Sequence, residues 1–214
     1  MKLSPTITNS EVIKNLQIRL GDRKAPELRL TIVYELNVLL GQLEDGPVWP
    51  WFMVKTASLT FLPGEYKKEL PADFILELEE DQPALLEQGV LLGFLRKTDV
   101  AHLSEFPVGP PSHYSIVGNE IILAPVTTVE QTVEFRYYGA STPVVDNTEV
   151  VTNPWLVNAY NFTTFSVLAH IARHIVKSDE MAMRFDKDAA TAGKAFWILD
   201  EARKQANADY VIDD

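Results

Sequence analysis

The chain has 214 residues, of which 46% are hydrophobic and 23% charged, and it contains no cysteine. This length can bury a sizeable core, and the composition is that of a globular protein. The missing cysteines exclude disulfides, thiolate zinc sites and cysteine nucleophiles. The net charge of −11 is uneven, being zero over residues 1–50, −9 over 51–150 and −2 over 151–214. Because an acidic surface repels a phosphate backbone, a dedicated nucleic-acid binder is disfavoured.

The chain has no apolar run of about 18 residues, the length that suggests a membrane-spanning helix. Its first residues, Met-Lys-Leu-Ser-Pro, lack the apolar core of a signal peptide. We therefore expect a soluble protein that is neither secreted nor inserted in a membrane.

Two helices are predicted at the start of the chain. The first begins after Thr8, which has the capping-box spacing to Glu11, and ends at Gly21. Pro26 opens the second helix, in which leucine, isoleucine and valine recur every three or four residues until Gly46.

Three aromatic residues surround a proline in Trp49-Pro50-Trp51-Phe52. This stretch is either an exposed binding surface or a buried corner where the chain leaves the helices for a sheet. The buried corner is favoured, because large aromatic side chains most often serve packing.

The middle of the chain, residues 51–150, is predicted to be rich in β-strands because valine, threonine and aromatic residues alternate there. The expected strands are Met53–Phe61, Phe74–Glu79, Tyr114–Val117, Glu120–Leu123 and Thr132–Tyr138. Gly118-Asn119 has the sequence of a hairpin turn. In the second strand, alternation places Leu76 on one face and Glu77 with Glu79 on the other.

Two segments of this region are harder to assign. The apolar stretch Ala84 to Leu95 is interrupted by two glycines, and its periodicity does not distinguish a helix from a strand. Thr98 to Phe106 is predicted to be one short helix capped by Thr98.

Two further helices are predicted after the strands, between Asn153 and about residue 207. Asn153 has the character of an N-cap and Pro154 takes the first helical position. The first helix ends at a polar break, Lys177 to Glu180, and the apolar stripe of the second includes Phe196 and Leu199. A helical hairpin cannot bury both of its faces alone, so we expect it to pack against the helix that contains Leu28 to Leu43.

Helices followed by strands and then by helices indicate an α+β fold with separate layers. We expect a discontinuous helical bundle, formed by residues 1–50 and 151–207, that contains a β-rich insertion of residues 51–150. Residues 208–214 would form a short C-terminal tail.

Few residues have the pattern of a catalytic or metal site. His170 and His174 have the i, i+4 spacing of two zinc ligands, but Arg173 lies between them and no glutamate follows the first histidine, so packing or surface histidines are favoured. His102 and His113 are isolated. The chain also lacks a Gly-x-Ser-x-Gly motif, a phosphate-binding glycine loop and a dinucleotide fingerprint. We therefore predict no catalytic, cofactor-binding or metal-binding residue, and no enzyme.

Two other classes of function stay open at this stage. The thirty carboxylates could supply the acid and base of a peptidoglycan-cleaving glycosidase. The aromatic residues of the β-rich insertion could serve a carbohydrate- or receptor-binding module.

Several motifs occur together in a recognisable order. They are Trp49-Pro50-Trp51-Phe52, Leu70-Pro71-Ala72-Asp73-Phe74, the hairpin from Tyr114 to Pro125, Phe135-Arg136-Tyr137-Tyr138 and Asn153-Pro154-Trp155-Leu156. Over residues 9–205 this succession resembles the head-to-tail adaptor proteins, also called connector or tail accessory proteins, of short-tailed bacteriophages and related prophages.

The resemblance implies a structural virion protein without a cofactor. Such adaptors form a ring, typically of twelve copies, below the portal protein, where they extend the DNA channel and dock tail proteins of the nozzle or fibres. It also implies synthesis in the host cytoplasm and a final place at the head–tail junction. In the family the helical part forms the ring and a C-terminal segment reaches the portal. Here that segment would be the short Ala208–Asp214.

This context gives two hypotheses for individual residues. Glu77, Glu79, Glu130 and Glu134 could line the channel, so that DNA passes without specific binding; a solvated sheet face explains them equally well. The subunit or partner interface could include Trp49, Trp51, Arg173, Arg184, Lys187 and Lys194, because mixed charge suits contacts between subunits.

Overall fold

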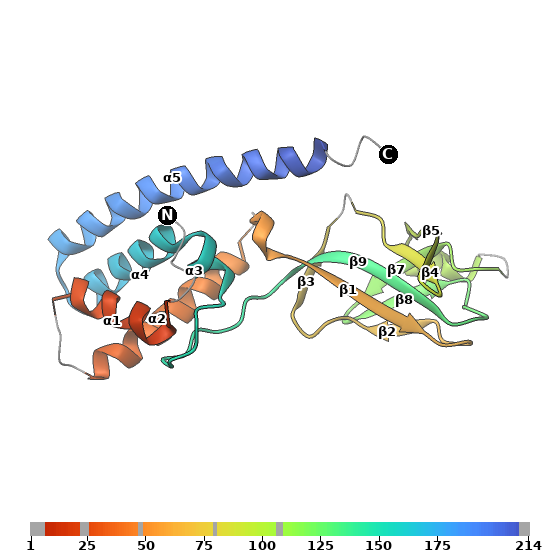
Figure 1. Cartoon of the computed structure of the whole chain (residues 1–214), viewed down its shortest axis with the longest axis horizontal. Coiled ribbons are helices and arrows are strands. Elements are labelled where there is room, and N and C mark those ends of the chain that lie inside the picture. The colour runs from red at the N-terminus through yellow and green to blue at the C-terminus, as the bar shows by residue number, and fades with distance from the viewer. Residues whose placement is uncertain (1–6, 22–25, 47–48, 79–80, 106–108, 210–214) are drawn as a thin grey trace. The chain divides into compact units, whose positions relative to one another are not determined.

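The computed structural model describes residues 7–21, 26–46, 49–78, 81–105 and 109–209. It confirms the mixed α+β class. The chain forms two compact units, Met1–Met53 with Ser141–Asp214, here called the helical unit, and Val54–Ala140, here called the sheet unit (Figure 1). The helices are α1 Asn9–Arg19, α2 Pro26–Glu44, the 3-10 helix η1 Trp51–Met53, α3 Pro154–Asn158, α4 Tyr160–His174 and α5 Asp179–Asp209.

The predicted helix starts are confirmed. The backbone N–H of Glu11 donates to Thr8 Oγ1 at 3.3 Å, and the Glu11 carboxylate accepts from the N–H of Thr8 at 2.8 Å, which completes the capping box. Gly21 follows the end of α1 with φ +81°, a conformation that favours glycine. The side chain of Asn153 accepts from the N–H groups of the first turn of α3, with Pro154 at the first position.

The single helix expected from Asn153 is wrong, because the structure divides it into α3 and α4 at Ala159 (φ −124°, ψ 31°). The side-chain amide of Asn158 donates to the carbonyl of Pro154 at 3.0 Å. It thereby competes for an acceptor of the helical ladder. Apolar periodicity continues through this break, so the pattern does not reveal it.

Helix α4 lies between α2 and α5 (Figure 1). On one side, the rings of Phe162 and Phe165 stack on Phe196 and Phe185 of α5, with centroid distances of 6.0 and 6.4 Å. The side facing α2 places His170 Nε2 3.3 Å from a Glu35 carboxylate oxygen. The helical hairpin is therefore covered by α2, as the sequence predicts.

The apolar stripe of α5 differs from the prediction near its C-terminal end. Leu199 is 60% exposed, whereas the neighbouring Asp200 is only 1% exposed. The observed inward positions include Phe185, Ala189, Phe196 and Asp200, in steps of four and seven residues. The inward face is polar at Asp200 because this carboxylate binds the backbone of η1.

The segment that returns from the sheet unit runs along α1 and α2 without forming a helix. Arg29 donates from Nε and Nη2 to both carboxylate oxygens of Asp146, at 2.8 and 2.6 Å. Asn37 exchanges two hydrogen bonds with the backbone of Val144. These contacts attach residues 141–152 to α2, and the N–H groups of Asn9 and Ser10 in α1 donate to the carbonyls of Glu149 and Asn147.

The sheet unit consists of two sheets. Its elements are β1 Val54–Phe61, β2 Lys67–Glu69, β3 Phe74–Glu77, β4 Ala84–Glu87, β5 Val90–Phe94, β6 Arg96–Lys97, the 3-10 helix η2 Val100–Glu105, β7 His113–Val117, β8 Glu120–Ala124 and β9 Gln131–Gly139. The first sheet has the order β1-β9-β4-β5, with β3 also paired to β9, and the second has the order β2-β8-β7-β6.

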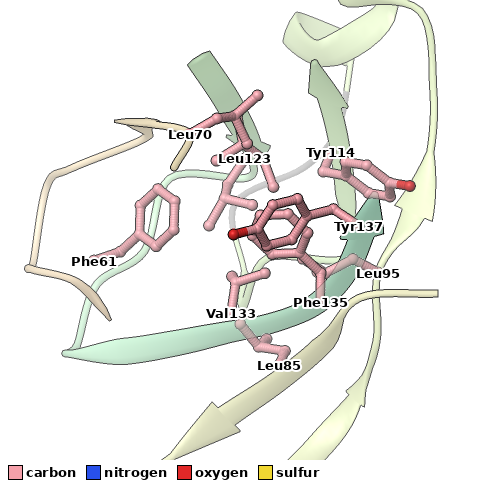
Figure 2. Close-up of a cluster of buried hydrophobic side chains, with 10 residues drawn as sticks. Phe61, Leu70, Leu85, Leu95, Tyr114, Leu123, Val133, Phe135 and Tyr137 are labelled. Atoms are coloured by element: carbon pink, nitrogen blue, oxygen red, sulfur yellow. The ribbon is translucent and has the colours of Figure 1, made fainter. Parts of the chain in front are cut away.

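Side chains from both sheets meet in one core (Figure 2). Phe61, Leu85, Val133, Phe135 and Tyr137 come from the first sheet, and Tyr114, Ile121 and Leu123 from the second. The hydroxyl of Tyr137 donates to Asp73, whose other carboxylate oxygen accepts from Lys55. Lys55 also donates to the carbonyl of Ala140 at 2.7 Å. This network joins the two chain ends of the sheet unit.

The predicted hairpin of β7 and β8 and the strand β9 are confirmed. The unassigned stretch Ala84 to Leu95 forms the hairpin of β4 and β5, which turns at Gln88 (φ 52°) and Gly89 (φ 79°). The helix expected from Thr98 is instead η2. Its first turn is capped by Asp99, which accepts from the N–H of Ala101 at 2.9 Å, while the N–H of Thr98 donates to Tyr114 of β7. Phe106 lies outside the described residues.

Candidate assembly surfaces

The aromatic stretch after α2 forms the predicted corner. Pro50 and Met53 are buried, and the ring of Phe52 lies 5.2 Å from Trp155 and 5.8 Å from Phe196, centroid to centroid. The backbone N–H of Trp51 donates to Asp200 Oδ1 at 2.9 Å. The corner is thus held by α3 and α5, and packing accounts for most of it.

The two tryptophans proposed for an interface are both half-buried. The guanidinium of Arg203 lies 4.6 Å from the ring centroid of Trp51, a cation–π contact. Trp49 also interacts within the chain. Their part in an interface between proteins therefore stays a prediction.

The four basic residues proposed for the same interface lie on α4 and α5. Arg173 of α4 forms an ion pair with Asp186 of α5, so its charge is engaged within the helical unit. Arg184, Lys187 and Lys194 are exposed on α5. Their spacing of three and seven residues sets Lys187 and Lys194 on the same side of the helix.

The four glutamates proposed to line a channel have different surroundings. Glu130 and Glu134 are exposed, and Glu79 lies outside the described residues. The expectation of a solvated Glu77 is wrong, because Glu77 is only 8% exposed. It accepts from the Tyr114 hydroxyl at 3.1 Å and forms an ion pair with Lys97.

A register shift explains this reversal. The pairing of β3 with β9 is irregular between Phe74 and Leu76, so simple alternation fails and Leu76 is exposed. Burial also raises the pKa of the Tyr114 hydroxyl. A sequence pattern could not locate the bulge, and the partners of the buried carboxylate, Lys97 and Tyr114, are remote in the sequence.

The histidine pair lies on the surface of α4. Both side chains are exposed, their ring centroids are 4.5 Å apart, and His170 Nε2 lies 3.3 Å from a carboxylate oxygen of Glu35. Within the described ranges, no three His, Asp or Glu side chains gather into a group that could hold a metal ion. None of the described helices has the length and apolar content needed to cross a membrane.

Two shallow depressions adjoin α5. One is lined by α3, α4 and α5, with Phe162, Phe196 and Leu199 among its residues. The other lies on α5 alone, between Ala190 and Ile198. Neither is lined by a carboxylate. Exposed apolar side chains beside basic ones are typical of a surface that binds another protein. The helical unit therefore has a surface of the kind found in assembly proteins.

Comparison with protein families shows which kind of assembly protein this chain is. The chain matches the model of the family described as SU10 adaptor protein over residues 7–210. Because the match covers nearly the whole sequence, the chain belongs to this family, and it is a head-to-tail adaptor of bacteriophages. A search of curated proteins found no significant match. The family is structural, so the match supports neither the glycosidase nor the glycan-binding alternative.

Proposed function

We propose that this protein joins the head of a phage to its tail as a ring, typically of twelve copies, below the portal protein. One copy would contact the portal, its neighbours in the ring and a tail protein of the nozzle or fibres. The observation that carries the proposal is the family match over residues 7–210. The exposed apolar and basic side chains of α5 support it, because they provide a surface for neighbours.

The ring would extend the DNA channel. Glu130 and Glu134 are exposed, and Glu134 pairs in register with Ser58 on a polar face of β1 and β9. If this face lines the channel, like charge lowers its affinity for the phosphate backbone. Reversal of both charges to lysine would then slow genome release from the virion, and this effect should weaken with added salt. Unchanged release would remove these two residues from the channel.

The test of the adaptor function is assembly on the cognate portal. The purified chain and the purified portal are mixed, and complexes are analysed by light scattering and negative-stain microscopy. We expect a discrete added ring with the rotational symmetry of the portal. A chain that stays monomeric beside the correct portal would contradict the proposal.

A further inference from the structure

The helical unit has two outer faces on opposite sides. Because α4 lies between α2 and α5, the outward side of α2 and the outward side of α5 point away from each other (Figure 1). Large apolar side chains lie on both: Leu30 and Tyr34 on α2 are 72% and 65% exposed, and Met183 and Ile198 on α5 are 64% and 61% exposed. A soluble monomer rarely leaves such residues grouped without a use.

The outer face of α5 is basic at its centre, where it also has a hollow. Met183, Lys187, Lys194 and Ile198 follow one another at helical spacing on the side opposite Phe185 and Phe196. Between the apolar ends, a shallow depression is lined by the small residues Ala190, Thr191 and Ala195, together with Lys194 and Ile198. Lys187 and Lys194 lie at the centre of this side, and the same seven-residue spacing places Glu180 and Glu201 towards its two ends; all four are exposed.

The outer face of α2 is acidic and has a protruding ring. Glu27, Leu30 and Tyr34 share this side, and the exposed Asp45 follows the helix end on the same side. The only basic residue of α2, Arg29, is bound by Asp146 and lies off this face. This face therefore complements the basic centre of the α5 face in charge, and it carries a large aromatic side chain where α5 has small residues.

We propose that the outer face of α5 in one copy packs against the outer face of α2 in the next copy, with Tyr34 in the depression on α5. The occupant is a second copy, because every chain carries both complementary faces in equal number. The two faces lie on opposite sides, so the contact is heterologous and repeats around a ring instead of ending at a dimer. Ring formation itself belongs to the proposed function, on which this proposal rests. The outer faces of α5 and α2 are the surfaces through which neighbouring copies would close the ring.

The size of the contact explains why the chain should assemble on a template. A helix of 19 residues such as α2 is about 28 Å long at 1.5 Å per residue. With a contact width of about 10 Å, one face buries roughly 300 Å², well under the roughly 800 Å² per partner of a standard interface. A single contact is therefore weak, and a portal that gathers many copies would favour the closed ring.

Cross-linking tests the contact directly, because the chain has no cysteine of its own. The double variant Tyr34→Cys/Ala195→Cys, at high protein concentration, is treated with a short thiol-specific bifunctional reagent and analysed under denaturing conditions. We expect a ladder that extends beyond the dimer, whereas each single variant stops at the dimer. The matched control is Tyr34→Cys/Ser58→Cys, since Ser58 is exposed on β1. No species above the dimer, or an equal ladder from the control, would overturn the proposal.

A substitution separates this inference from the adaptor function. Tyr34→Arg places a cation against the basic centre of the α5 face and removes the aromatic ring, and we expect each contact to weaken roughly 30-fold, as for a central interface tyrosine. Tyr66→Arg, at an exposed tyrosine of the sheet unit, is the matched control. If Tyr34→Arg still forms complete rings on the portal, the named contact is wrong while the adaptor function stands. If the double variant Tyr34→Cys/Ala195→Cys gives the ladder but the natural chain never binds the portal, the contact stands while the adaptor function fails.

Discussion

Asp200 provides the sharpest test of how the helical unit holds the corner that leads into the sheet unit. Its side chain is 1% exposed, and Oδ1 accepts from the backbone N–H of Trp51 at 2.9 Å. Oδ2 lies 2.9 Å from Lys204 Nζ but receives no well-directed hydrogen bond, so this second contact is an ion pair only. We therefore predict that Asp200→Ala destabilises the helical unit.

The magnitude follows from these two contacts. A hydrogen bond to a charged acceptor contributes about 1.5–3 kcal/mol, and an i, i+4 ion pair contributes about 0.3–0.5 kcal/mol. Asp200→Ala should lower the free energy of unfolding by about 2–3 kcal/mol, because the N–H of Trp51 loses its acceptor. Asp200→Asn keeps an acceptor and should cost about 1 kcal/mol.

Urea unfolding followed by tryptophan fluorescence and by circular dichroism measures these differences. The control is Glu201→Ala, whose exposed side chain lies next to Asp200 on α5 and should change stability by less than about 0.5 kcal/mol. Equal unfolding midpoints for Asp200→Ala and Glu201→Ala would refute the role given to the buried carboxylate.

Three other perturbations have defined outcomes. Burial disfavours the charge of Asp73, but hydrogen bonds from Lys55 and Tyr137 outweigh it and lower its pKa below 3.8. The stabilisation is present above that unfolded value and is lost as pH falls through the folded pKa, so Asp73→Asn should remove this acid dependence from unfolding of the sheet unit. Phe196→Ala should cost about 3–5 kcal/mol, because the ring is buried among aromatic residues. Lys187→Glu should leave the monomer folded and weaken ring assembly roughly two- to fivefold.

Each of these three predictions has a control variant or a result that would contradict it. Asp99→Asn, at an exposed turn carboxylate, should leave the acid dependence of unfolding intact. If Asp73→Asn and Asp99→Asn reduce this dependence equally, Asp73 is not the group that causes it. Lys14→Glu, an exposed charge reversal on α1, should assemble normally. If it impairs assembly as much as Lys187→Glu, only net charge matters. A loss under about 1 kcal/mol for Phe196→Ala would mean that the aromatic cluster packs loosely.

Local signals predicted most of the elements. The capping box at Thr8, the turn at Gly118-Asn119 and the cap at Asn153 each depend on residues three or fewer positions apart, so a sequence reveals them. The corner at residues 49–52 followed from the size of its aromatic side chains.

The sequence-based predictions were wrong where residues distant in the sequence determine whether a side chain is buried. Glu77 is buried because Tyr114 and Lys97 compensate its charge, and Asp200 is buried because it binds the N–H of Trp51. Neither partner is adjacent in sequence, and alternation or helical periodicity assigns a carboxylate to solvent by default. The outer faces of α2 and α5 could not be predicted from the sequence, because they follow from the position of α4 between the two helices. No sequence pattern indicates that position.

A reconstruction of the head–tail junction in intact virions tests the central claim most directly. We expect a ring of this chain between the portal and the tail, with the helical units of neighbouring copies in contact through α5 and α2. A virion whose junction lacks this chain would contradict its role as the adaptor.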